Sequence, residues 1–231
     1  MTLVIFAKSL YNISFLYSIR ELKFMKKEET GLKKVKGKKT KQKLFTSAAK
    51  LFNQYDFDEV TVDRIVEAAG IAKGTFYIYF ESKDALIAAF LSDYAGRVDM
   101  DYRAVLASFP PNTPVSQMLL GLIGKIADTL TDEIGHASMR TVYKLQLTGS
   151  VDMSAINGYD RELYHIFADL LDNGLQKGEF QTGLSLSTLT RHFVMAIRGI
   201  TYEWCIRYPE FDLKEQALTH FKLLLSGIDS K

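Results

Sequence analysis

Cysteine is scarce in this chain of 231 residues, where Cys205 is the only one. A single cysteine excludes an internal disulfide, and we expect Cys205 to be a small core residue beside Trp204 and not a redox sensor. Patterns typical of catalysis are missing as well, because no histidine pair has the HExxH spacing or another metal-ligand spacing. The four histidines are scattered at His136, His165, His192 and His220. We therefore predict no metal, no cofactor and no enzymatic activity, and the composition is that of a cytoplasmic protein.

The first 25 residues are apolar and aromatic, yet their longest stretch free of charge is the eleven residues from Ser9 to Ile19. Eleven residues are too few to span a bilayer, and no small-residue cleavage pattern follows them, so we expect no stable membrane association. Three interpretations stay open for this segment. It is a weak signal or anchor, an additional packed helix, or translated upstream sequence with the true start at Met25.

The net charge of +2 conceals an uneven distribution along the chain. Residues 26–43 hold nine lysines against Glu28 and Glu29, which gives this stretch a net charge of +7. We expect residues 1–39 to form an N-terminal extension with a flexible, lysine-rich arm, which suits contacts with the phosphates of a nucleic acid. The alternative is a solubilising tail, because such runs are common and this one contains no arginine.

Two helices separated by a tight corner are predicted after residue 60. Thr61 is a good N-cap for a helix over residues 62–69, and Gly70 can adopt the left-handed conformation that ends it. Only residues 71–73 remain before the next helix, a spacing typical of the corner in a helix-turn-helix. Such a motif presents its second helix to the major groove of DNA.

The second of these helices is short and is built around Phe76. Ala72 at its N-cap position is a poor cap, so we expect packing of Phe76 and Phe80 to hold the helix in place. Because these two residues supply the inward face, Tyr77 should be exposed.

Apolar residues recur at helical spacing elsewhere, and no strand alternation of any length follows Pro111. A helix over about residues 41–55 precedes the pair, and Ser82 begins a fourth helix that stops at Phe109. Further helices are predicted at residues 113–130, 137–147, 159–177, 187–208 and 215–227. The expected fold is all-α, with an N-terminal three-helix helix-turn-helix domain over residues 40–90 and an all-helical domain over residues 91–231.

The N-terminal domain also resembles a known family. Three short helices, the segment KGTFYIYF and then SKDAL opening a longer helix resemble the DNA-binding domain of the TetR family of transcriptional repressors. The resemblance is close over about fifty residues, and the remainder is similar in size and helical layout. It implies that seven residues contact DNA, the first of them through a phosphate: Thr61, Lys73, Gly74, Thr75, Tyr77, Tyr79 and Lys83.

The helix predicted at residues 187–208 is apolar around most of its circumference, so it needs packing partners on two sides. One partner is the core of the same subunit, and we expect the other to be a second copy of the chain. Residues 159–208 would then form a four-helix bundle with their symmetry mates in a homodimer. The alternative is that this helix is central to a larger monomeric core.

The predicted function is that of a ligand-responsive transcriptional regulator. As a dimer it would bind a palindrome in double-stranded DNA and repress, and a small apolar or amphipathic effector would release it. The alternative is a helical small-molecule-binding protein or enzyme that does not bind DNA. Candidate effector-binding residues, each of which is also typical of an ordinary core, are Phe90, Tyr94, Met118, Met139, Tyr143, Phe167, Met195 and Trp204.

Overall fold

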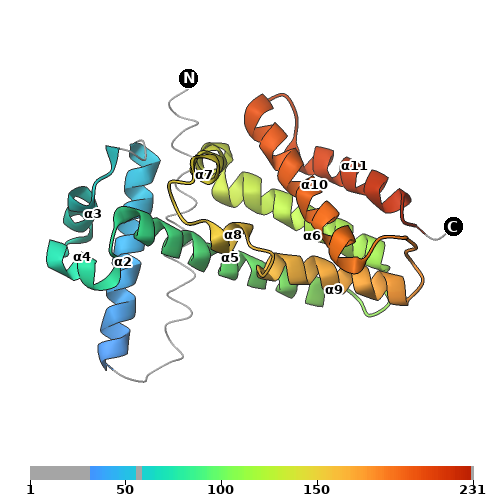
Figure 1. Cartoon of the computed structure of the whole chain (residues 1–231), viewed down its shortest axis with the longest axis horizontal. Coiled ribbons are helices and arrows are strands. Elements are labelled where there is room, and N and C mark those ends of the chain that lie inside the picture. The colour runs from blue at the N-terminus through green and yellow to red at the C-terminus, as the bar shows by residue number, and fades with distance from the viewer. Residues whose placement is uncertain (1–31, 56–58, 230–231) are drawn as a thin grey trace.

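The computed structural model describes residues 32–55 and 59–229, which are helical apart from connecting segments and one isolated bridge between Phe180 and Asp229 (Figure 1). The question of a start at Met25 lies outside the described residues. In chain order the helices are α2 (Leu32–Gln54), α3 (Val62–Ala69), α4 (Lys73–Tyr79), α5 (Lys83–Ala107), α6 (Val115–Asp128), the π-helix η2 (Thr129–Ile134), α7 (His136–Thr148), α8 (Ser154–Asn157), α9 (Glu162–Gln176), α10 (Leu186–Arg207) and α11 (Leu213–Ser226).

Helices α2, α3 and α4, with the first turns of α5, form a small domain at one end of the molecule (Figure 1, left). We call it the reading domain, and its described residues are 32–55 and 59–90. Its core includes Leu44, Ile65, Phe76 and Leu86, whose side chains are completely buried.

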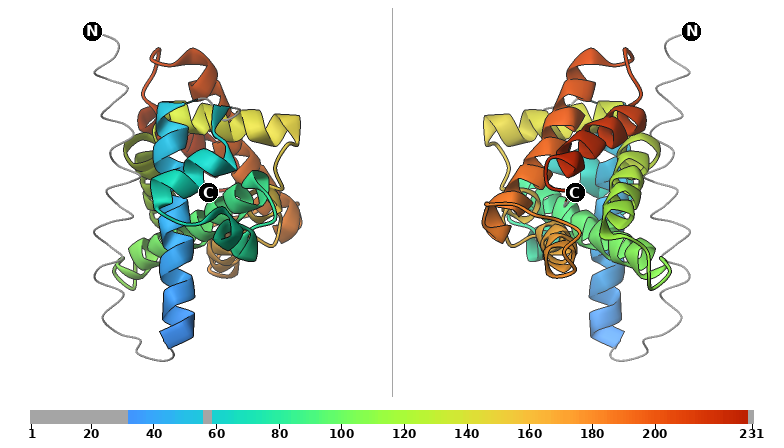
Figure 2. Two further views of the ribbon diagram at one scale, coloured as in Figure 1. Left: turned by 90° about the vertical axis from the view of Figure 1, so that its left-hand side faces the viewer. Right: turned by 90° about the vertical axis from the view of Figure 1, so that its right-hand side faces the viewer.

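Helix α2 begins at Leu32, nine residues before the predicted start at residue 41. The stretch from Leu32 to Thr40 is therefore helical, and the expectation of a flexible arm was wrong for this part of the chain. Lysine is a good helix former, so a lysine-rich stretch can extend a helix that packing has already nucleated. Figure 2 shows this end of α2 extending away from the packed helices.

The local capping signals in the sequence are confirmed. The Thr61 hydroxyl accepts a hydrogen bond from the backbone N–H of Arg64 at 3.3 Å, and the Ser82 hydroxyl accepts one from that of Ala85 at 3.0 Å. Gly70 has φ 63° and lies in the left-handed region. These residues fix the end of α3 and the starts of α3 and α5, which sets the positions of the reading-domain helices along the chain.

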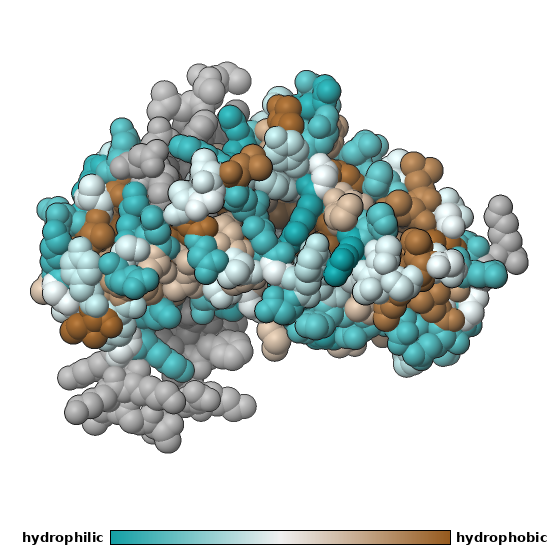
Figure 3. Space-filling view, viewed as in Figure 1, coloured by the Kyte–Doolittle hydropathy of each residue, from teal (hydrophilic) through white to brown (hydrophobic). Residues whose placement is uncertain are grey.

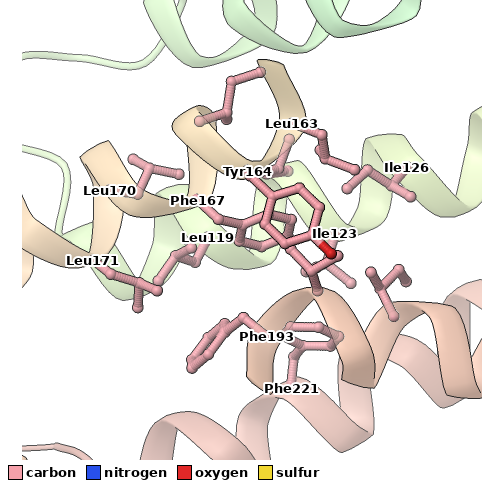
Figure 4. Packing of buried hydrophobic residues seen from close by; sticks show 14 of the residues in the cluster. Leu119, Ile123, Ile126, Leu163, Tyr164, Phe167, Leu170, Leu171, Phe193 and Phe221 are labelled. Carbon is pink, nitrogen blue, oxygen red and sulfur yellow. The ribbon is translucent and has the colours of Figure 1, made fainter. Parts of the chain in front are cut away.

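A second domain, residues 91–229, is built mainly from α6, α9, α10 and α11, and we call it the C-terminal domain. Figure 4 shows Phe167 of α9, Phe193 of α10 and Phe221 of α11 pointing into one core with Leu119 and Ile123 of α6. The Phe193 and Phe221 rings lie 5.6 Å apart in an edge-to-face arrangement. This packing joins α6, α9, α10 and α11 in one hydrophobic core.

The two domains share α5, and residues of the C-terminal domain also enter the reading-domain core. Leu145 of α7, together with Val151 and Met153 before α8, is buried in the same cluster as Phe76. The junction is therefore a packed interface and not a linker.

Candidate nucleic-acid interface

The corner between α3 and α4 is held by backbone hydrogen bonds that follow the left-handed Gly70. The N–H of Gly70 donates to the carbonyl of Glu67 at 3.1 Å, and the N–H of Ile71 donates to the carbonyl of Val66 at 3.0 Å. A side chain at position 70 would be strained at this φ, so glycine is required for the turn. The corner places α4 directly after α3 with residues 70–72 between them.

Helix α4 has no side-chain cap at Ala72, as predicted. Phe76 is completely buried, and its ring lies 5.8 Å from that of Phe80, which in turn lies 5.7 Å from that of Phe45 on α2. Packing of three aromatic rings therefore holds a helix of only seven residues, which would not be stable alone in water.

The opposite side of α4 faces solvent. Tyr77 is 51% exposed, which confirms its predicted exposure, and Lys73 and Gly74 are also exposed. Thr75 and Tyr79 are partly buried, and Tyr79 packs against the reading-domain core beside α2. Lys83 follows at the first turn of α5 and is partly buried. The structure thus gathers six of the seven predicted DNA contacts on or next to α4, whereas Thr61 caps the preceding helix.

Ile78 is the residue of this surface that the sequence analysis did not single out. Its side chain is 77% exposed, more than that of any other large hydrophobic residue described. The exposure of Ile78 could have been predicted from the helical spacing, because a residue two positions from the buried Phe76 falls on the other side of the helix. An exposed isoleucine here can make apolar contact with the methyl group of thymine in a major groove.

Lys73 is paired with Asp63 of α3, whose carboxylate oxygens lie 2.7 and 3.0 Å from the Lys73 Nζ. The hydrogen bond and the nearby negative charge of Asp63 raise the pKa of Lys73, so this lysine is protonated at neutral pH. Both side chains are more than half exposed, and such surface pairs contribute little stability. Lys73 is therefore oriented by Asp63 but remains available to another anion.

The candidate effector-binding residues do not form one group. Phe90 lines a cavity between the two domains, while Met139, Tyr143 and Trp204 meet in a cluster with Leu213. Three further candidates lie in or against the C-terminal core, namely Tyr94, Met118 and Phe167. Met195 lies on α10 and is 59% exposed.

Cys205 lies in the Trp204 cluster and is buried, which confirms its predicted place in the core. Burial raises the pKa of the Cys205 thiol to about 11, so the thiolate that a redox sensor needs is scarce at neutral pH.

Among residues 32–55 and 59–229, no group of histidine, cysteine and carboxylate side chains is arranged to hold a metal ion. No helix in the described part of the chain has the length and apolar character needed to cross a membrane.

Comparison with known proteins gives the same assignment as the geometry. Residues 44–90 match the family described as "Bacterial regulatory proteins, tetR family". The chain is 25% identical over 200 residues to the HTH-type transcriptional regulator AcrR of Shigella flexneri, covering 83% of this chain and 90% of AcrR. It is 24% identical over 194 residues to the fatty acid metabolism regulator protein of Bacillus subtilis, covering 81% of this chain and 95% of that protein.

Solved structures share the fold over most of the chain. The transcriptional regulator FadR from Bacillus subtilis, in complex with stearoyl-CoA, has a TM-score of 0.66 at 22% identity and covers 80% of this chain and 98% of its own. The fold and the corner between α3 and α4 therefore define a helix-turn-helix DNA-binding regulator, a class that is not enzymatic. Residues 44–90 are those of a TetR-family DNA-binding domain, and the rest of the chain is similar in sequence and fold to regulators of that family.

Proposed function

We propose that the protein is a repressor that binds a palindromic operator as a homodimer in the cytoplasm and leaves it when an effector binds the C-terminal domain. The observation that carries DNA binding is the corner at Gly70, which leaves Tyr77 exposed on α4 while Phe76 enters the core. Helix α4, which we call the reading helix, occurs once per subunit, so a two-fold axis requires two half-sites, and hence an inverted repeat.

The proposed DNA contacts divide into two kinds. Lys73, Thr75 and Tyr77 lie on α4 and are assigned to base edges, whereas Lys83 at the start of α5 is assigned to a phosphate. The remaining assigned residues, which position the protein on DNA, are Thr61, Gly74 and Tyr79.

The proposed effector is a long-chain amphipathic molecule of the acyl-coenzyme A type. Support comes from the relatives, because FadR of Bacillus subtilis is described with stearoyl-CoA and FadR of Thermus thermophilus with lauroyl-CoA. Further support comes from Tyr94, whose hydroxyl is buried at the edge of the C-terminal core without a hydrogen-bond partner. Burial raises the pKa of Tyr94, so the hydroxyl stays protonated and can donate to an oxygen of a ligand.

The proposed dimer interface lies on α10 and α11. Met195, Tyr202 and Ile206 follow one another at helical spacing on α10, and their side chains are 59%, 43% and 60% exposed. Leu223 of α11 adds a side chain that is 68% exposed. Figure 3 shows hydrophobic residues gathered near the right-hand end of the molecule, the end where Figure 1 marks the C-terminus. The interface predicted within residues 159–208 is thus proposed to use α10, because the apolar residues of α9 are largely buried in the core.

Titration of labelled fragments of the chain's own upstream region, at several salt concentrations and with or without stearoyl-CoA, tests the proposal. We expect a specific complex that weakens as salt rises and that stearoyl-CoA dissociates. Absence of any specific complex would overturn DNA binding. A complex that withstands stearoyl-CoA would overturn only the effector class.

Lys83→Ala and Tyr77→Ala are expected to separate positioning from base reading. Lys83→Ala should weaken binding to specific and random DNA about equally and lower the salt slope by about 1, because one phosphate contact is lost. Tyr77→Ala should cost about 1–3 kcal/mol on the specific site and little on random DNA. Fluorescence anisotropy with both DNA types measures the difference, and equal losses on both DNAs for both variants would contradict the assignment.

Ile206→Asp is expected to produce a monomer, because dimerisation would bury a carboxylate in an apolar interface at a cost of several kcal/mol. The side chain is 60% exposed in one subunit, so the monomer itself should keep its melting temperature. Light scattering gives the mass. Leu147→Asp is the matched control, since Leu147 is 74% exposed on α7 and outside the proposed interface. A dimer that survives Ile206→Asp would place the interface elsewhere.

A further inference from the structure

A cavity of about 110 Å³ lies at the junction of the two domains. Its walls come from α2 and the start of α5 on the reading-domain side and from α7 on the C-terminal side. Phe52, Phe90 and Val142 are among the lining residues, one from each of these helices. Phe90 therefore faces the cavity between domains.

The lining of this cavity is almost entirely apolar. Of the described residues that line it, only Ser138 and Thr141 have polar side chains, and the Thr141 hydroxyl donates to the carbonyl of Ala137 in its own helix at 3.3 Å. Within residues 32–55 and 59–229, no charged side chain lines it. Enclosed apolar cavities stay dry and take up small hydrocarbons, and one of about 150 Å³ holds benzene, so the smaller volume here admits a group no larger than benzene. The chemistry and the size both select a compact, uncharged hydrocarbon group.

One wall of the cavity belongs to the reading domain, and the other belongs to the C-terminal domain. Ala48 on α2 is buried in the same cluster as Phe76 of the reading helix. On the other wall, α7 is tied to α10 by the Tyr143 hydroxyl, which donates to the carbonyl of Arg198 at 2.9 Å. His136 at the start of α7 also contacts the carbonyl of Cys205 through Nε2 at 3.1 Å. A molecule bound in the cavity would thus contact both the reading domain and α7, the helix that is hydrogen-bonded to α10.

We propose that this interdomain cavity is a second ligand site, which binds a small uncharged hydrocarbon of about the size of benzene and thereby changes DNA affinity. The proposal rests on the DNA-binding function proposed above but not on the acyl-type effector. Filling an apolar void restores lost packing contacts and stabilises the arrangement of α2 against α7 that contains it. By linkage, the hydrocarbon must change the affinity for DNA by the same factor by which DNA changes the affinity for the hydrocarbon.

Benzene is the probe that tests the site in the full chain. We expect it to raise the melting temperature and to shift the methyl NMR signals of Val142 and Leu145, which line the cavity, but not those of Leu119 in the C-terminal core. It should also change the affinity for the specific DNA by about fivefold or more. Unshifted signals at Val142 and Leu145, or an unchanged DNA affinity at saturating benzene, would overturn the proposal.

Ala49→Leu is the variant that fills the cavity from its own wall. We expect it to abolish the benzene-induced rise in melting temperature and, without benzene, to move DNA affinity in the same direction as benzene moves that of the unmodified protein. Ala104→Leu, at an exposed position on α5 outside the lining, is the matched control and should leave both responses intact. A full benzene response in Ala49→Leu would contradict the site. If this variant does not fold, the methyl signals of the unmodified protein decide, and DNA binding without benzene tests the proposed function separately.

Discussion

Asp99→Ala is expected to lower the free energy of unfolding by about 3–5 kcal/mol, because it leaves a buried guanidinium without its partner. Asp99 on α5 is 1% exposed, and its carboxylate accepts two hydrogen bonds from Arg161, from Nε at 2.9 Å and from Nη2 at 2.8 Å. The Arg161 side chain is itself only 15% exposed. Removing the acid therefore strands a positive charge where water cannot solvate it well.

Urea denaturation followed by circular dichroism measures this effect, and the slope m should stay unchanged. Asp93→Ala is the matched control on the same helix. Asp93 pairs with Arg97 at 3.4 Å, but its side chain is half exposed, so its removal should cost less than about 1 kcal/mol. Equal losses in the two variants would show that the Asp99 pair is no more important than a surface pair.

Phe76→Ala is expected to destabilise the reading domain by about 3–5 kcal/mol and to abolish specific DNA binding. Phe76 is completely buried, and it is the side chain on which the short helix α4 depends, since Ala72 provides no cap. The C-terminal core contains none of the residues around Phe76, so much of the helical signal should persist when the reading domain melts.

Ile78→Ala is the control for this prediction, because Ile78 lies on the same helix and is 77% exposed. It should leave the melting temperature within a few degrees of the unmodified protein, while any change in DNA affinity reports a contact with the groove. The measurements are thermal unfolding and DNA titration. A Phe76→Ala protein that keeps both its stability and its specific affinity would contradict the role given to this side chain.

Capping residues made the boundaries of α3 and α5 predictable, because their signals are local. Thr61, Gly70 and Ser82 each act within one helical turn, so neighbouring residues suffice to interpret them. The start of α2 was not predictable in this way, since the lysine-rich composition before residue 41 suits both a helix and a solvated arm. The π-helix η2 after α6 was also missed, because its backbone spacing departs from the 3.6-residue period.

The residues expected around the effector show a different limit of sequence reasoning. Met195 and Trp204 lie on the same helix, yet Met195 is 59% exposed whereas Trp204 is 3% exposed. Helix α10 is apolar on several sides, so periodicity alone does not tell which side meets the core of the same subunit. That choice depends on how α9 and α11, the helices before and after α10, fold back against it, and the sequence of α10 alone does not contain this information.

Helix α5 is continuous over 25 residues, from Lys83 beside the reading helix to Ala107 in the C-terminal domain. At 1.5 Å per residue such a helix is about 37 Å long and acts as a rigid rod. A rotation of only about 5° at its C-terminal end would carry its N-terminal end through about 3 Å, close to the 3.4 Å that separates successive base pairs. In a two-fold dimer both rods would move, and the distance between the two reading helices would change by up to twice that amount. A displacement too small to disturb the packing of the C-terminal core can therefore change the distance between the reading helices of a dimer so that it no longer matches the spacing of the two half-sites.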